Sequence, residues 1–142
     1  MSQTGLDVLD KSLQATNRWL KLMMLELETD DRGLAFNALA GALHAVRDRI
    51  DPDDAIELGE RMPMLLRGAY YEGWHPADRR PPDDFFSHLA GEIPCDGEIC
   101  AGEVARAGFA VMAQCLDRAE TAKLRRVLPR ETRPLWPEEL VH

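Results

Sequence analysis

The apolar and polar positions along this chain follow the pattern of successive amphipathic helices. Large apolar residues in the first segment recur at spacings of three, four or seven, which predicts a helix of about 20 residues with one apolar stripe. That stripe comprises Leu6, Leu9, Leu13, Leu20 and Met24. The next comprises Leu39, Leu43, Val46 and Ile50, beside the small residues Ala38, Gly41, Ala42 and Ala45. We therefore expect an all-α fold in which a neighbouring helix approaches the second helix closely.

Capping residues and prolines mark the expected helix boundaries. Asp30 or Asp31 precedes the second stripe and can cap that helix. Asp51 and Asp117 likewise stand at expected helix starts, each followed three residues later by an acidic residue, a pattern similar to a capping box. Pro52 stands at the first position of a third helix, which Pro63 interrupts before a further short helix begins. Residues 75–82 (HPADRRPP) have the composition of a linker, and the helical pattern resumes after them.

The chain aligns with itself without a gap when it is shifted by 66 residues. In this alignment the apolar stripes of the first part of the chain match those of the second part, and the expected helix starts also match. Matched pairs include Leu43 with Phe109, Val46 with Met112, Ile50 with Leu116, Pro63 with Pro129, and Tyr70 with Trp136. We expect one domain over residues 1–142 that contains two three-helix repeats, approximately 17–71 and 83–137. Each repeat would bury its apolar face against the other, giving a bundle of about six main helices.

Composition and charge narrow the class of protein. Hydrophobic residues make up 45% and charged residues 30% of the chain, which is typical of a globular domain. The net charge of −8 disfavours nucleic acid as a partner, because binding to phosphates requires a cationic surface. The chain has no apolar run of the roughly 20 residues that span a bilayer, and residues 1–10 do not resemble a signal peptide. We expect a cytoplasmic protein without a membrane partner.

The proposed third helices of the two repeats carry opposite charge. Residues 51–67 hold five acidic and two basic side chains, a net −3, whereas residues 117–133 hold six basic and three acidic ones, a net +3. Variation of a solvated surface would explain this difference. Complementary docking would also explain it, either between the halves or head-to-tail between molecules. DNA binding by residues 117–133 is a third, less favoured interpretation.

Two groups of residues were considered for metal binding or catalysis. His75, His88, Cys95 and Cys100 are of the types that bind zinc, but the spacing of the two cysteines is longer than that of usual ligand pairs. A local disulfide and surface histidines are the alternative, so we predict no metal and no cofactor. His44 with Asp48 resembles a base and its orienting carboxylate, yet no nucleophile motif accompanies them. We assign no catalytic residue and favour a non-enzymatic protein.

Aromatic side chains are concentrated just before the predicted linker, and they form the candidate binding site. Tyr71, Trp74 and His75 could line a pocket in which Arg67 binds an anionic group. The structural alternative is that Tyr70 and Trp74 are core residues and that Arg67 pairs with a carboxylate. Arg133 and Trp136 in the second repeat match Arg67 and Tyr70 in the first, which favours this structural interpretation.

Four stretches of the chain carry a resemblance to a known family. They are GLDVLDKSLQATNRWL at 5–20, ALHAVRDR at 42–49, MPMLLRGAYYEGW at 62–74 and the prolines and tryptophan of 128–137. In these stretches the chain resembles the bacterial family called domain of unknown function 2267, with RGAYYEGW as the most specific part. The resemblance implies a small bacterial helical protein and carries over no activity, cofactor or catalytic residue.

The function that we expect is therefore general. The chain is predicted to be a non-enzymatic intracellular binding or interaction module, whose partner is another protein or a second copy of itself. The alternative is a small-ligand-binding protein or an enzyme that uses Arg67, Tyr71, Trp74 and His75.

Overall fold

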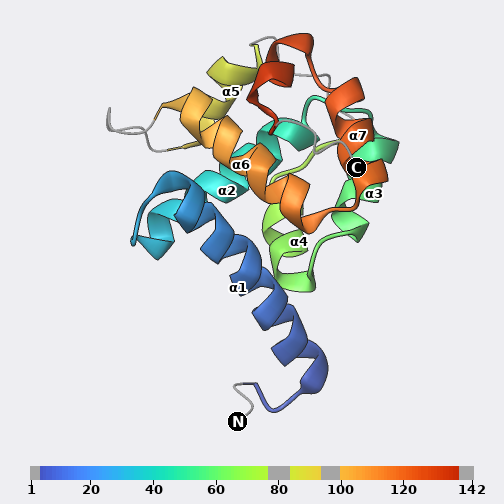
Figure 1. Ribbon diagram of the computed structural model, residues 1–142. Coiled ribbons are helices and arrows are strands. Elements are labelled where there is room, and N and C mark those ends of the chain that lie inside the picture. The colour runs from blue at the N-terminus through green and yellow to red at the C-terminus, as the bar shows by residue number, and fades with distance from the viewer. Residues whose placement is uncertain (1–3, 77–83, 94–99, 138–142) are drawn as a thin grey trace.

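The computed structural model describes residues 4–76, 84–93 and 100–137, and the regular elements of these residues are all helices (Figure 1). They are α1 (Asp7–Leu27), α2 (Arg32–Arg47), α3 (Pro52–Glu60), α4 (Met64–Tyr71), α5 (Phe85–Glu92), α6 (Ala101–Cys115), α7 (Arg118–Val127) and the 3₁₀ helix η1 (Arg130–Leu135). The all-α prediction is confirmed. The described helices outnumber the roughly six main ones expected, because Pro63 separates α3 from α4 and Pro129 separates α7 from η1.

Aspartates begin several of these helices, as predicted. Asp31 caps α2 by accepting a hydrogen bond from the amide of Leu34 at 3.0 Å. Asp117 caps α7 in the same way, with the amide of Glu120 at 2.8 Å. Asp51 precedes α3, but its side chain makes no such bond there, and Pro52 sets the first turn instead. Most of the predicted linker, and Cys95 with it, lies outside the described residues.

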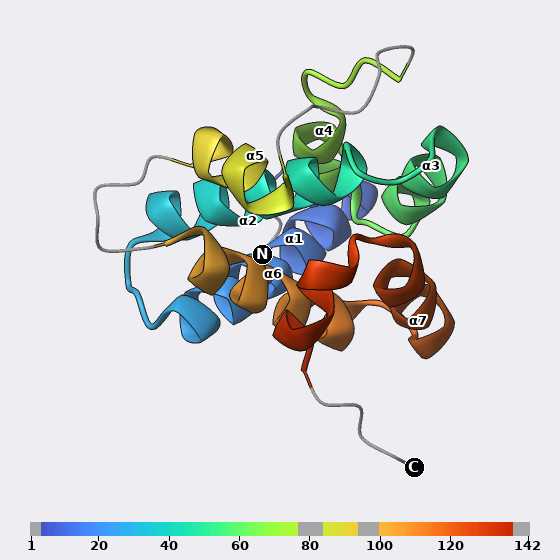
Figure 2. The same cartoon turned by 90° about the horizontal axis from the view of Figure 1, so that it is seen from above.

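Helices α2 and α6 form the centre of the molecule and pack against each other, with α1 against α6 and α5 against α2 (Figure 2). Two glycines permit this close approach. A Cβ on Gly41 would lie 2.7 Å from the Ile93 side chain, and one on Gly108 would lie 2.9 Å from the Cβ of Ala42. The close contact predicted at the small residues of the second helix is therefore confirmed.

Stacked aromatic rings join α5, α6 and η1. Phe85 stacks on Phe109 with ring centroids 5.9 Å apart, and Phe109 stacks on Trp136 at 4.4 Å. All three side chains are buried. These offset pairs contribute favourable packing beyond the burial of their area.

The apolar stripe predicted for α1 coincides with its buried face only in part, at Leu20. The buried side chains are Ser12, Thr16, Trp19, Leu20 and Met23, whereas Leu6 is 57% exposed. The first turns of α1 project beyond the other helices in Figure 1, so the body of the molecule does not cover them. Among the described residues, no helix combines the length and the apolarity needed to span a membrane.

Candidate functional site

Arg67, the anion-binding residue of the predicted site, lies on α4 and faces the end of α3. Its Nε donates to the carbonyl of Gly59 at 2.9 Å, and its NH2 donates to the carbonyl of Met62 at 2.9 Å. Carbonyls in the last turn of a helix lack their usual partners within it, and Arg67 donates to two carbonyls at the end of α3, of which that of Gly59 also accepts from the amide of Met62 at 3.1 Å. These bonds replace the carboxylate pair that the structural interpretation expected.

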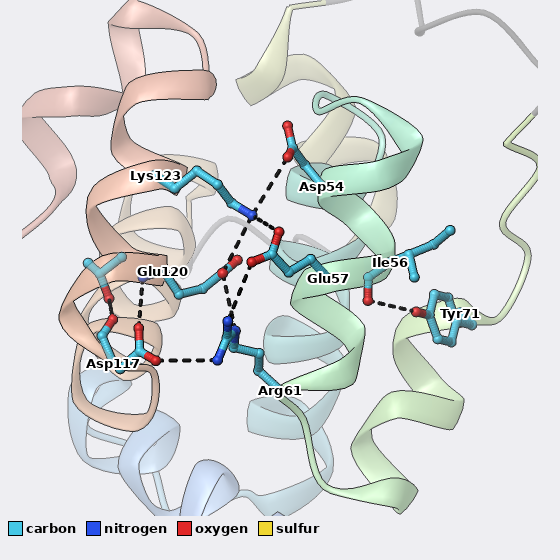
Figure 3. Close-up of polar contacts among 9 residues, drawn as sticks. Asp54, Ile56, Glu57, Arg61, Tyr71, Asp117, Glu120 and Lys123 are labelled. Carbon is cyan, nitrogen blue, oxygen red and sulfur yellow. Dashed lines mark hydrogen bonds and ion pairs between the residues drawn. The ribbon is translucent and has the colours of Figure 1, made fainter.

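The aromatic residues of the predicted site lie together only in part. The ring of Tyr71 stacks on that of Trp74, with centroids 5.4 Å apart and planes inclined by 26°. The hydroxyl of Tyr71 donates to the carbonyl of Ile56 on α3 at 3.3 Å (Figure 3). Both rings are half-buried, and His75 is exposed. Tyr70 lies beside Tyr71, with ring centroids 4.9 Å apart, but its side chain is fully buried, and burial raises the pKa of its hydroxyl.

The oppositely charged helices α3 and α7 lie side by side and are joined by a network of ion pairs (Figure 3). Lys123 on α7 places its Nζ 2.6 Å from Glu57 and 3.6 Å from Asp54, both on α3. Arg61, after the end of α3, reaches back to Asp117 at 3.3 Å and Glu120 at 3.3 Å. The docking of complementary charges, predicted as one alternative, thus occurs within the chain.

The electrostatic environments of the two glutamates in this network differ. The ammonium of Lys123 and the guanidinium of Arg61 lower the pKa of Glu57, which is well exposed. Burial raises the pKa of Glu120, despite the opposing effect of Lys123, because its carboxylate is almost fully removed from water. Burial alone would lower the pKa of Lys123, but its carboxylate partners raise it instead. The network is an arrangement of structural ion pairs.

Beyond this network, the basic side chains of the segment 117–133 surround a hollow at the surface. The hollow measures about 330 Å³ and is lined by Ala122, Arg125, Arg126 and Arg133. Its arginines could hold an acidic group. The net charge of −8 opposes the approach of a long nucleic-acid duplex, so this hollow alone does not favour DNA binding.

A second cluster of polar side chains lies between α2 and α5. His44 contacts the Glu92 carboxylate at 3.3 Å and the Ala69 carbonyl at 2.7 Å, so its partner is not Asp48, as the sequence suggested. Asp48 instead pairs with Arg47 at 2.8 Å and with His88 at 3.3 Å. The possible ligand atoms of Asp48, His88 and Glu92 all lie within 4.8 Å of one another.

The metal-binding group considered from the sequence differs from this cluster. Of that group, His88 is shared, Cys95 lies outside the described residues, and His75 and Cys100 are exposed. Sequence reasoning took His88 for a surface residue, whereas its side chain is only 13% exposed. Glu92 was not singled out at all. Its signal was its position four residues after His88, which places both side chains on one face of a helix.

Four large apolar side chains at the start of α1 and at the start of α4 are exposed. They are Leu6, Val8, Met64 and Leu65, each 45–59% exposed, and we call this set the α1–α4 patch. The amide of Leu65 donates to the hydroxyl of Ser12 at 3.1 Å, which joins α4 to α1 at this point. Val8 lies one turn before Ser12 on the same face of α1. The bond to Ser12 thus places the start of α4 beside the first turns of α1, and exposed apolar side chains from adjoining elements are typical of a surface that binds a partner.

Comparison with known proteins identifies a family but no activity. The family model described as "Uncharacterized conserved protein (DUF2267)" matches residues 16–135. No curated protein matches the chain. The match agrees with the resemblance found in the sequence, and because the family carries no assigned activity, function has to be argued from the surfaces of this molecule.

Proposed function

We propose that this chain, which belongs to the DUF2267 family, is a non-enzymatic module that binds an amphipathic helix of a partner protein. The observation that carries the proposal is the exposure of the α1–α4 patch, where the first turns of α1 extend past the helices that cover the rest of it. A helix laid beside Val8 and Leu65 would bury the apolar side of both α1 and α4.

The size of the patch is suited to one helix. Full burial of an aliphatic side chain contributes about 1.5–3 kcal/mol, and four half-exposed residues supply roughly half of that each. The total of about 3–6 kcal/mol is comparable to the low end of the cost of association, about 4–15 kcal/mol, so ion pairs at the flanks of the helix must contribute as well. The hydroxyls of Ser12 and Thr16 continue the same face of α1 into the bundle, where both are buried.

Charge favours a basic partner over a second copy of the chain. The first turn of α1 carries Asp7 and Asp10, and the whole chain has a net charge of −8. Two copies brought together at this end would repel each other, whereas a helix with basic flanks would be attracted. We therefore assign the patch to an amphipathic helix that carries lysine or arginine beside its apolar stripe.

The proposal is tested with a designed helical peptide of leucine and lysine and with its counterpart of leucine and glutamate. We expect the basic peptide to bind the full chain, with an affinity that falls about tenfold or more in the double variant Val8→Ser/Leu65→Ser. Fluorescence anisotropy of the labelled peptide measures both affinities. The substitutions change no charge, so non-specific attraction is unaffected.

The matched control is Leu25→Ser, which removes an exposed apolar side chain at the far end of the same helix. It should leave the affinity unchanged. Equal binding of the acidic peptide, or equal losses in the control and the patch variant, would contradict the proposal. Light scattering of the free chain provides a further test, because a dimer that Val8→Ser/Leu65→Ser dissociates would mean that a second copy occupies the patch.

The alternative of a ligand site at Arg67, Tyr71, Trp74 and His75 has less support. Arg67 is already engaged by the carbonyls at the end of α3, so an anionic ligand would have to compete with them. The half-buried stack of Tyr71 on Trp74 is the feature that still favours it.

We also propose that the chain is a single domain built from two repeats, residues 17–71 and 83–137, related by a pseudo-twofold axis. Two contacts support this. Glu57 meets Lys123, and Ala42 would meet a Cβ on Gly108. Both pairs are separated by 66 residues, the shift that aligns the chain with itself. On a twofold axis a residue meets its own equivalent, so these are the pairs that such symmetry requires.

The packing of the remaining helices agrees with the same symmetry. The shift of 66 residues relates α1 to α5 and α2 to α6. The contact of α1 with α6 then corresponds to the contact of α5 with α2, and both are extensive. Equivalent faces are thus buried against each other in a reciprocal way.

A further inference from the structure

We infer that Asp48, His88 and Glu92 form a binding site for a divalent transition-metal ion, which links α2 to α5. Asp48 lies at the end of α2, and His88 and Glu92 lie four residues apart on α5. Together they offer one imidazole nitrogen and two carboxylates, a set that first-row transition ions bind.

The separations within the cluster fit coordination of a single ion. Zn²⁺ binds nitrogen and oxygen at about 2.0–2.1 Å, so two ligands of a tetrahedral ion lie roughly 3.3 Å apart. His88 Nε2 is 3.3 Å from Asp48 Oδ2 and 3.6 Å from Glu92 Oε1. The third separation is within 4.8 Å. Small rotations of the Glu92 side chain, which is 33% exposed, would bring all three atoms onto one ion.

The imidazole of His88 is oriented toward these carboxylates but makes no hydrogen bond with them. Its Nε2 is buried, and within the described part of the chain no group meets it with hydrogen-bond geometry. A buried polar atom without a partner is costly, and in folded proteins such an atom is commonly satisfied by a bound water or ion. An ion between His88 and the two carboxylates satisfies all three groups together.

Neighbouring groups hold the two carboxylates in position. Arg47, which is 4% exposed, donates to both oxygens of Asp48 at 2.8 and 3.1 Å, and the carbonyls of Tyr70 and Glu72 fix its guanidinium. On the other side, His44 donates from Nε2 to the carbonyl of Ala69 and turns its Nδ1 to Glu92 Oε2. Supporting contacts of this kind commonly surround metal ligands. The Arg47 charge also keeps the affinity below that of a purely acidic site.

The cluster lies at one of the two helix contacts that the proposed duplication makes equivalent. The positions that correspond to His88 and Glu92 are Leu22 and Glu26, and Gln114 corresponds to Asp48. The α1–α6 contact therefore lacks the histidine and one carboxylate. A need for folding alone would apply to both contacts, so the difference favours a function specific to α2 and α5.

The test uses the full chain and the metal alone. Titration with Zn²⁺ in a calorimeter should give one ion per chain. Glu92→Gln, which keeps the shape of a partly exposed side chain, should weaken binding by at least roughly 10–100-fold, as should His88→Gln. Co²⁺ should bind the same site with visible absorption that Zn²⁺ abolishes, whereas excess Mg²⁺ should not displace it. Circular dichroism checks that each variant keeps its helical content.

Matched variants separate this site from other zinc ligands of the chain. Glu26→Gln removes the carboxylate at the equivalent position of α1, His75→Gln removes an exposed histidine, and Cys95→Ser/Cys100→Ser removes two thiols. We expect binding to be unchanged in all three. Absence of Zn²⁺ binding to the full chain, undiminished binding in folded Glu92→Gln, or loss of binding in the cysteine variant would each overturn the inference.

Discussion

Two tyrosine hydroxyl groups at the end of α4, one buried and one at the surface, join α4 to α3. Tyr70 is fully buried and donates to the carbonyl of Ala55 at 2.7 Å, whereas its neighbour Tyr71 makes a longer bond of 3.3 Å to Ile56 at the surface. The two tyrosines thus repeat one kind of contact in two environments. Removing each hydroxyl in turn therefore shows how burial changes the contribution of such a hydrogen bond to stability.

Removal of the buried hydroxyl should destabilise the protein more than removal of the exposed one. Tyr70→Phe leaves the carbonyl of Ala55 without its partner away from water, which costs about 1–3 kcal/mol. Tyr71→Phe leaves a carbonyl that water can reach, so we expect a change of less than about 0.5 kcal/mol. Urea unfolding of both variants measures the difference, and equal effects would contradict it.

Glu57 and Glu120 should make contributions of opposite sign to the pH dependence of stability. The pKa of Glu57 is lowered in the fold from its ordinary value of 4.5, so its ionised form stabilises the protein above that pH. This stabilisation is lost as the pH falls through the folded pKa. The pKa of Glu120 is raised by burial, so its ionisation above pH 4.5 opposes folding.

Two isosteric substitutions test this difference of sign. At neutral pH, Glu57→Gln should lower the free energy of unfolding, whereas Glu120→Gln should leave it unchanged or raise it. Both differences from the natural chain should diminish as the pH falls below 4.5, where glutamates become protonated. The measurement is denaturant unfolding at a series of pH values. A loss of stability in Glu120→Gln that matches Glu57→Gln at neutral pH would contradict the expectation.

The sequence predicted individual capping residues well and polar partners poorly. Asp31 and Asp117 act on amides three residues ahead, so local spacing was sufficient to identify them. The partners of His44 and His88 lie on a helix about 40 residues away. Each histidine has a carboxylate four residues later, and that local spacing drew attention to Asp48 as the partner of His44. Because α2 and α5 pack with opposite directions, His44 contacts Glu92 and His88 contacts Asp48, which the local spacing does not reveal.

At the scale of the helix, two glycines have opposite roles that can be compared directly. Gly108 of α6 faces Ala42 of α2 so closely that an added Cβ would lie at 2.9 Å, whereas a Cβ on Gly68 of α4 would meet nothing within 4 Å. Gly108→Ala should therefore destabilise the protein by about 1–3 kcal/mol through overpacking. Gly68→Ala should stabilise it by roughly 0.5–1 kcal/mol, because alanine favours the helix. Thermal and urea unfolding measure both changes.

An exchange of the two residues provides the control for the overpacking. The double variant Ala42→Gly/Gly108→Ala keeps one methyl group between α2 and α6 and only moves it across the contact. It should regain most of the stability that Gly108→Ala loses, less the cost of a glycine in α2. If the double variant were less stable than the sum of the two single changes, the methyl contact would not be the cause.

Helix α1 illustrates why periodicity located the elements but not all of their faces. Its stripe of leucines correctly predicted a helix, yet the buried face follows Ser12, Thr16 and Met23 instead of Leu6 and Leu9. Small hydroxyl residues allow α4 to approach, and the body of the molecule ends before the first turns of α1. For α2, which is covered on most sides, the predicted stripe is fully buried. How far the neighbouring helices extend along α1 depends on the tertiary structure, so the apolar stripe of α1 alone does not predict which of its turns are buried.

At the scale of the whole molecule, the central contact joins a helix from the first half of the chain to one from the second half. Helices α2 and α6 pack at the core, α1 covers α6, and α5 covers α2. In the proposed halves, the first helix of each half therefore packs on the central helix of the other half. A half by itself would expose the side of its central helix that holds Gly41 and Ala42, or Gly108, because these residues face the other half.

Division of the chain within residues 77–83 should consequently give two fragments that fold only together. Alone, each is close to the size at which one core is marginal, and its apolar face is open, so we expect little cooperative unfolding. Mixed in equal amounts, the fragments should recover the circular dichroism and a single unfolding transition of the full chain. Because apolar contact dominates this interface, salt should weaken the complex only slightly, through the part-buried Glu57–Lys123 pair and the exposed Arg61–Asp117 pair. A fragment that unfolds cooperatively by itself and does not bind the other would show that the chain is not built from two interdependent halves.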